Sequence, residues 1–141
     1  MKTRLFCTLA ACVALLLASL PVFAHHSFAA EFDVKQPVTL KGTVTKVEWT
    51  NPHVWIYLDV ADEQGNVQHW QCENGAPNAL ARMGWTRNSL KAGDQVTVEG
   101  FRAKNDDKTA NARQIILPDG RKVFSGSAED DGPGKFKESG Q

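Results

Sequence analysis

Half of the four histidines in the chain stand side by side, at His25 and His26. Imidazole nitrogens ligate Cu(II), Ni(II) and Zn(II), and copper has the highest intrinsic affinity of these ions for such donors. If the chain is cleaved directly before His25, the α-amine and the imidazole of that residue can close a chelate ring on one metal ion. The pair therefore predicts a transition-metal site, with copper as the candidate ion. The competing interpretation is a polar start to the chain that binds nothing.

Cleavage before His25 is itself predicted by the residues that precede it. A basic start, an apolar run over residues 5–20 and small-residue positions at Val22 and Ala24 are typical of a secretory signal peptide. We expect residues 1–24 to be removed and the protein to be periplasmic or secreted, with no stable membrane anchor after cleavage. A transmembrane helix is the weaker interpretation because the run is short for a bilayer. Lipidation at Cys12 is also weaker, because it would leave a very short apolar core in the signal.

The rest of the chain has the length of one ordinary domain. The full sequence has 16 basic and 16 acidic residues, and the signal peptide carries two of the basic ones, so the remainder is slightly acidic. This balance opposes a nucleic-acid partner. After cleavage Cys72 is the sole cysteine, so an internal disulfide cannot form. Its place in an alternating strand predicts a buried, inert thiol.

The other two histidines, His53 and His69, lie in segments that alternate like β-strands. In the first segment Val54, Ile56 and Leu58 share one face, and in the second Trp70 and Cys72 do. If those faces point into a core, the opposite faces form one outward surface. That surface contains His53, Trp55, Tyr57, His69, Gln71 and Glu73.

We predict two uses for this surface. His53 and Glu73 are candidate metal ligands together with His25 and His26, while Trp55, Tyr57 and His69 form a candidate ligand face. Two structural interpretations stay open. Cross-strand pairs of this kind stabilise a sheet without binding anything, and "TNPH" is also a turn that simply precedes a strand.

The elements that must position these side chains follow from the periodicity. Strands are expected at 38–49, 53–60, 67–73, 95–103 and 110–117, with a short further strand at 121–124. A single short helix is expected at 77–83, with Pro77 at its first position and with Leu80 and Met83 on one face. Gly42 in mid-strand predicts a bend or bulge.

This order predicts an all-β fold, a small five- to six-stranded OB-like barrel with one short helix between strands 3 and 4. An SH3-like barrel is the rival architecture, and the position of the helix argues against it. The expected organisation is an N-terminal segment at 25–36, the barrel domain at 37–124 and a disordered tail at 125–141.

Four stretches also carry a resemblance to known proteins: "AHHSFAAEFD", "PVTLKGTVTKVEWTNPHVWIYLDV", "GAPNALARMGWTRNSLKAGDQVTVEGFRAK" and "TANARQIILPDGRKVF". Together they resemble a family of exported bacterial proteins classed only as a domain of unknown function. The resemblance implies export and carries no activity, cofactor or catalytic residue. The chain departs from the family at Ala76, where serine is frequent, and at Cys72, where an apolar residue is usual. Ala76 removes a side chain that could cap the helix.

The sequence contains no serine-nucleophile motif, glycine-rich phosphate loop, CxxC pair or HExxH run, so we do not expect an enzyme. The leading hypothesis is an exported, non-catalytic binding module whose ligand is a small molecule or a transition metal such as copper. The alternative is a structural or interaction protein of the cell envelope, which docks a protein or glycan through exposed aromatic residues at Trp49, Trp55 and Tyr57. Nucleic acid is not an expected partner.

Overall fold

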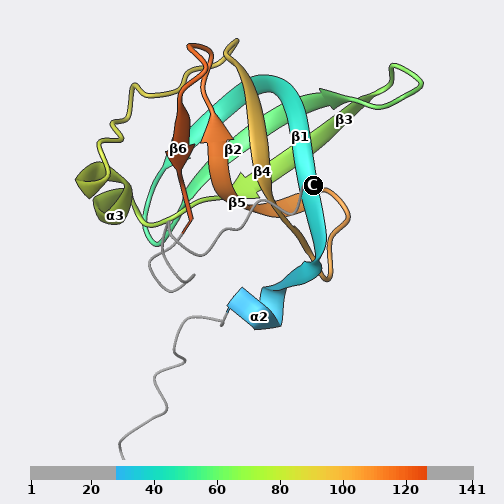
Figure 1. Ribbon diagram of the computed structural model, residues 1–141, viewed down its shortest axis with the longest axis horizontal. Helices are drawn as coiled ribbons and strands as arrows, with labels where there is room; N and C mark the ends of the chain where they lie inside the picture. Colours follow the sequence, from blue (N-terminus) through green and yellow to red (C-terminus); the bar gives the residue numbers. More distant parts are fainter. Residues whose placement is uncertain (1–27, 127–141) are drawn as a thin grey trace, which may run out of the picture.

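The computed structural model describes residues 28–126 (Figure 1). The predicted signal peptide, His25, His26 and the stretch from Ser127 onward lie outside the described residues. The elements are α2 (Phe28–Glu31), β1 (Phe32–Trp49), β2 (Val54–Ala61), β3 (Val67–Glu73), α3 (Pro77–Arg82), β4 (Gln95–Ala103), β5 (Thr109–Ile116) and β6 (Lys122–Phe124). None of the helices among residues 28–126 is long and apolar enough to cross a membrane.

The six strands form one sheet in the order β3-β2-β1-β4-β5-β6, in which each strand is antiparallel to its neighbours. One further pairing departs from this order, because Gln71–Glu73 of β3 lie parallel to Thr109–Asn111 of β5. The strands β1 to β4 therefore have two partner strands each, and β5 has three, namely β4, β6 and β3. The expectation of a mostly β fold with only short helices is confirmed.

Strand β1 is 18 residues long and serves two partners. Its first part pairs with β4 and its second part with β2, and Thr43 pairs with both. The strand curves strongly between the two pairings (Figure 1), with a bulge between Val44 and Lys46. Gly42 fits this region because a Cβ there would lie 2.6 Å from the carbonyl oxygen of Asp59. The residue marked in the sequence as a bend or bulge is thus a point of close backbone approach.

The core lies on the face predicted from the alternation. Val54, Ile56 and Leu58 of β2 are buried, as are Trp70 and Cys72 of β3. Burying these side chains supplies most of the free energy that holds the sheet in its shape. The predicted inward and outward faces of β2 and of most of β3 are therefore confirmed.

Helix α3 is present, but only one of the two residues predicted to share a face of it is buried. Leu80 is buried, whereas Met83 is 41% exposed. The helix ends at Arg82, so Met83 is the residue that follows it and does not continue the helical face. Trp85 is buried just beyond the helix, and its indole nitrogen donates to the carbonyl oxygen of Phe124 at 3.0 Å.

The ordered fold extends beyond both ends of the predicted barrel. Strand β1 begins at Phe32, whose ring stacks on Phe28 at 5.5 Å, and Phe28 also meets Phe101 edge-on at 5.9 Å. At the other end Ser125 is fully buried and its hydroxyl donates to the carbonyl oxygen of Ala112. Packing of the three rings and burial of a hydrogen-bonded serine hold these short extensions on the sheet.

Gly100 makes the tightest backbone contact that can be tested. A Cβ at this position would lie 1.8 Å from the carbonyl oxygen of Asn111, at a register shift between β4 and β5. We expect Gly100→Ala to lower the free energy of unfolding by about 3 kcal/mol or more, since the neighbouring strand must move. Urea denaturation followed by tryptophan fluorescence measures this.

Gly120→Ala is the matched control for Gly100→Ala. Gly120 has a positive φ of 83° and no atom within 4 Å of the added Cβ. This variant should therefore lose only about 1–2 kcal/mol, from backbone strain. Equal losses in the two variants would show that the β4–β5 contact is not the constraint.

Candidate functional site

The register of β2 and β3 places the predicted outward residues in cross-strand pairs. Trp55 lies opposite Glu73, Tyr57 opposite Gln71, and Asp59 opposite His69. Residues in such pairs have Cβ atoms about 5 Å apart and can interact directly. The structure thus brings the predicted face together on two adjacent strands.

His53 and Glu73 form the closest pair on this face. His53 Nδ1 lies 2.6 Å from Glu73 Oε1, and the two side chains are 28% and 11% exposed. An Nδ1–H that donates to this carboxylate fixes the orientation of the imidazole, as carboxylates do for histidines that ligate metals. The sequence named both residues as candidate ligands, and the structure places them in contact.

Glu73 lies on the predicted face, opposite Trp55 and in contact with His53, but it is buried there rather than exposed. Its position at the end of β3 pairs in parallel with Asn111 of β5. Glu73 therefore has a paired strand on each side, with Trp55 of β2 on one and Asn111 of β5 on the other, and does not lie at a sheet edge. Burial makes the hydrogen bond to His53 more important, since a buried carboxylate without a partner is costly.

A cavity of about 500 Å³ lies beside this pair. His53, Trp55, Gln71 and Glu73 form its β2–β3 side. Most of the opposite wall comes from the junction of α2 with β1 and from the β4–β5 connection with the start of β5. Lys104 N–H donates to the carbonyl oxygen of Glu31 at 2.8 Å, which holds the junction next to the connection (Figure 1). The lining residues contributed by those two segments include Glu31, Phe32, Asn105, Asp106 and Thr109.

No pattern in the sequence predicts this second wall. Phe32 precedes the first predicted strand, and Asp106 lies in a polar loop that shows no pattern of its own. The only available signal was the general use of strand-connecting loops as binding walls in OB-like barrels.

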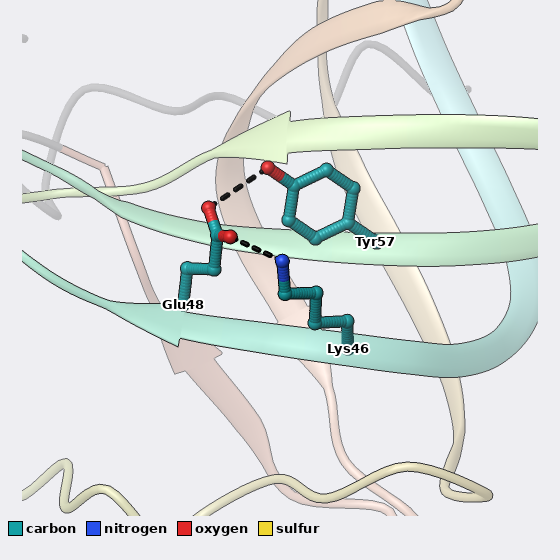
Figure 2. Close-up of polar contacts among 3 residues, drawn as sticks. All are labelled: Lys46, Glu48 and Tyr57. Atoms are coloured by element: carbon teal, nitrogen blue, oxygen red, sulfur yellow. Dashed lines mark hydrogen bonds and ion pairs between the residues drawn. The ribbon is translucent and has the colours of Figure 1, made fainter.

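Tyr57 is fixed by a polar network that the sequence analysis also missed. Its hydroxyl donates to Glu48 Oε2 at 2.9 Å, while Lys46 Nζ donates to the other oxygen of Glu48 (Figure 2). Lys46 Nζ also lies 5.3 Å from the centre of the Tyr57 ring. The hydrogen bonds from Lys46 and then Tyr57 lower the pKa of Glu48, and burial, followed by the bond to Glu48, raises the pKa of Tyr57. The tyrosine is therefore held in one orientation and keeps its proton.

Gln71 is fixed from the other side of the face. Its amide nitrogen donates to Thr109 Oγ1 at 2.7 Å, and that hydroxyl donates to Asp106 Oδ2 at 2.7 Å. The bond from Thr109, followed by one from the Lys108 N–H, lowers the pKa of Asp106. A chain of hydrogen bonds therefore joins β3 to the β4–β5 connection.

The remaining predicted residues do not join the His53–Glu73 pair. His69 is 82% exposed and its Nδ1 lies 2.7 Å from Asp59 Oδ1, so each imidazole has a separate carboxylate partner. Trp49 is half-buried and packs against the core, which corrects the expectation that it is an exposed docking residue. Cys72 is fully buried, and burial raises the pKa of its thiol to about 12, as expected for an inert cysteine.

The described part of the chain supplies only some of the donors for a metal. Among residues 28–126, no three His, Cys, Asp or Glu side chains are grouped so that they could hold a metal ion. His53 and Glu73 offer two donors at one place, and the other two predicted ligands, His25 and His26, lie outside the described residues.

The fold and the site define a small, mostly β protein with a polar and aromatic cavity on one sheet face. A family model described as "Family of unknown function (DUF6152)" matches residues 13–112, and the chain belongs to this family. The match includes every candidate site residue from His25 to Glu73. No curated protein and no solved structure matches the chain. The resemblance to a family of unknown function is thus confirmed, and the family description supplies no activity.

Double-mutant cycles can compare the two imidazole–carboxylate pairs in the same fold. For His53→Ala and Glu73→Ala we expect a coupling free energy of about 1–3 kcal/mol, because both groups are largely shielded from water. The His69→Ala and Asp59→Ala cycle should give about 0.2–1 kcal/mol, since that pair is largely exposed. Urea denaturation at pH 7 of all the single and double variants measures both. A His53–Glu73 coupling no larger than that of His69 and Asp59 would contradict the role of burial.

Proposed function

We propose that this chain is an exported, non-catalytic binding module built on an OB-like barrel, and that it holds a transition metal such as copper beside the His53–Glu73 pair. The observation that carries the proposal is the 2.6 Å contact between this imidazole and this carboxylate in the wall of a cavity of about 500 Å³. Both residues were candidate ligands from the sequence alone.

The pairing of the strands supports the OB-like barrel. In such barrels the sheet closes on itself, and a helix lies between the third and fourth strands. Here β3 pairs with β5 in addition to β2, and α3 lies between β3 and β4. Ligands of OB folds bind on the face of strands 2 and 3, between the connecting loops. The cavity beside His53 and Glu73 has the corresponding position.

The chemistry of the donors supports a transition metal. Imidazole with carboxylate suits borderline ions, and copper is favoured on affinity. The two donors need further ligands, which His25 and His26 can supply if cleavage exposes His25. His26 precedes Glu31, a residue of the cavity wall, by five positions. Three of those five steps lie in helix α2 and rise about 1.5 Å each, so His26 lies at most about 12 Å along the chain from Glu31, and covalent geometry keeps the histidines near the cavity.

The expectation of binding without catalysis rests on Cys72 and on the motifs of the sequence. The Cys72 thiol is buried and its pKa is raised to about 12, so it lacks the setting of a catalytic cysteine. The sequence also contains none of the catalytic motifs named above. Export is supported by the predicted signal peptide at residues 1–24.

Isothermal titration with Cu(II) tests the metal site. We expect one ion to bind per chain when the protein is produced with His25 as its first residue. One added residue before His25, and separately His53→Ala, should each weaken the affinity at least about tenfold, a change of about 1.4 kcal/mol. His69→Ala is the matched control and should leave the affinity unchanged, because that imidazole belongs to the other pair.

Two results of this titration would overturn the metal proposal. One is unchanged affinity in His53→Ala, which would detach the cavity from the metal. The other is the lack of any binding tighter than about 1 µM, near −8 kcal/mol. In that case an envelope interaction protein, which docks a protein or glycan through Trp55 and Tyr57, becomes the better proposal.

Cell fractionation tests export. When the full chain is expressed in a Gram-negative host, we expect the protein in the periplasmic fraction, with His25 as its first residue by N-terminal sequencing. Leu16→Arg interrupts the apolar run and should keep the uncleaved chain in the cytoplasm. Retention of the unaltered chain in the cytoplasm, or a periplasmic form that still begins with Met1, would contradict a cleaved signal.

A further inference from the structure

A second cavity, of about 320 Å³, lies beside the first on the β2–β3 face. Gln71 and Asp106 line both cavities. The second cavity continues past Tyr57 toward Asp59, His69 and Lys108. The two cavities are therefore neighbours along this face, and we call them together the β2–β3 groove.

The length of the groove follows from the strand register. Its floor runs from the Trp55–Glu73 pair, past Tyr57–Gln71, to the Asp59–His69 pair. Trp55 and Asp59 are four residues apart on one strand, which corresponds to about 13 Å at the rise of a β-strand. A floor of that length is longer than one sugar ring or one amino-acid side chain, so the groove suits an elongated ligand.

Each step along the floor combines different kinds of contact. Trp55 and Tyr57 provide flat apolar rings about 7 Å apart, the spacing of alternate residues on a strand. Opposite them lie the carboxylate of Glu73 and the amide of Gln71. A chain of sugar units presents C–H faces that pack on such rings and hydroxyls that hydrogen-bond to carboxylates and amides.

The charge of the groove opposes a polyanion such as an oligonucleotide. Four carboxylates line the two cavities, at Glu31, Asp59, Glu73 and Asp106. Lys108 is the one lysine or arginine among the described lining residues, and its Nζ lies 5.4 Å from the centre of the Trp70 ring. Phosphate groups would meet repulsion from the carboxylates, whereas uncharged hydroxyls would not.

Two polar groups of the floor are already held in position. Tyr57 is bonded to Glu48 and Gln71 to Thr109. A site of this kind loses little side-chain freedom when a ligand binds, which favours affinity. We propose that the β2–β3 groove binds a linear, uncharged oligosaccharide that spans both cavities. This inference rests on one part of the proposed function, namely that the β2–β3 face is the ligand face.

Titration with cellohexaose and chitohexaose, followed by amide chemical shifts and calorimetry, tests the inference. We expect saturable binding of at least one of these sugars with a Kd tighter than about 1 mM, with shift changes at residues of both cavities. Trp55→Ala and His69→Ala should each weaken binding more than about fivefold. Trp55→Phe keeps a ring and should retain most of the affinity. Lys91→Ala, an exposed site outside both cavities, should change nothing.

The outcomes separate this inference from the metal proposal. Thermal unfolding checks that each variant is folded, and Trp55→Phe provides a ring-bearing variant if Trp55→Ala unfolds. The oligosaccharide site would be overturned if neither sugar saturates the protein, or if Trp55→Ala binds sugar with unchanged affinity. Binding of tetralysine instead of sugar would assign the groove to a cationic peptide. Cu(II) binding by the unaltered protein without saturable binding of either sugar would overturn only this inference. Sugar binding without Cu(II) binding would support the oligosaccharide site and overturn the metal proposal.

Discussion

The double pairing of β1 is the constraint on which the rest of the structure depends. One strand of 18 residues joins the β2–β3 pair to the β4–β5 pair, with Thr43 at the point where the two pairings meet. Glycine at Gly42 and Gly100 lets neighbouring backbones approach more closely than any side chain would permit. The curvature of β1 then brings β3 beside β5. Without that meeting, Glu73 would lie at an open sheet edge and the cavity would lose a wall.

Burial distinguishes two imidazole–carboxylate pairs that have similar geometry. The His53–Glu73 and His69–Asp59 contacts have nearly equal lengths, 2.6 and 2.7 Å, but only the first is shielded from solvent. A shielded carboxylate needs its partner, so the orientation of His53 is fixed by the fold itself. The exposed pair can exchange its partner for water at little cost. The buried pair is therefore the better candidate for a permanent site, and the exposed pair is better suited to contacts with a ligand that arrives and leaves.

Much of this fold could be predicted from local sequence patterns, because alternation in a strand reports which side chains face the core. Alternation predicts the inward positions of Ile56, Trp70 and Cys72. The stretch "TNPH" predicts the turn before β2. Long-range pairing is not visible in a local pattern. The parallel contact of β3 with β5 removes Glu73 from a sheet edge, and the ring cluster of Phe28, Phe32 and Phe101 extends the fold before the first predicted strand. Alternation suggests that His53 and Glu73 share one face. The wall that encloses the pair is visible only in the tertiary structure.

The central claim is that the cavity beside His53 and Glu73 holds a metal ion. A crystal structure of the chain that begins at His25, grown with Cu(II) and measured at the copper absorption edge, tests this most directly. We expect an anomalous peak in the cavity, with an imidazole nitrogen of His53 at a coordination distance of about 2.0–2.1 Å, the range for imidazole on zinc. An anomalous peak located elsewhere on the molecule, with none beside His53, would contradict the claim.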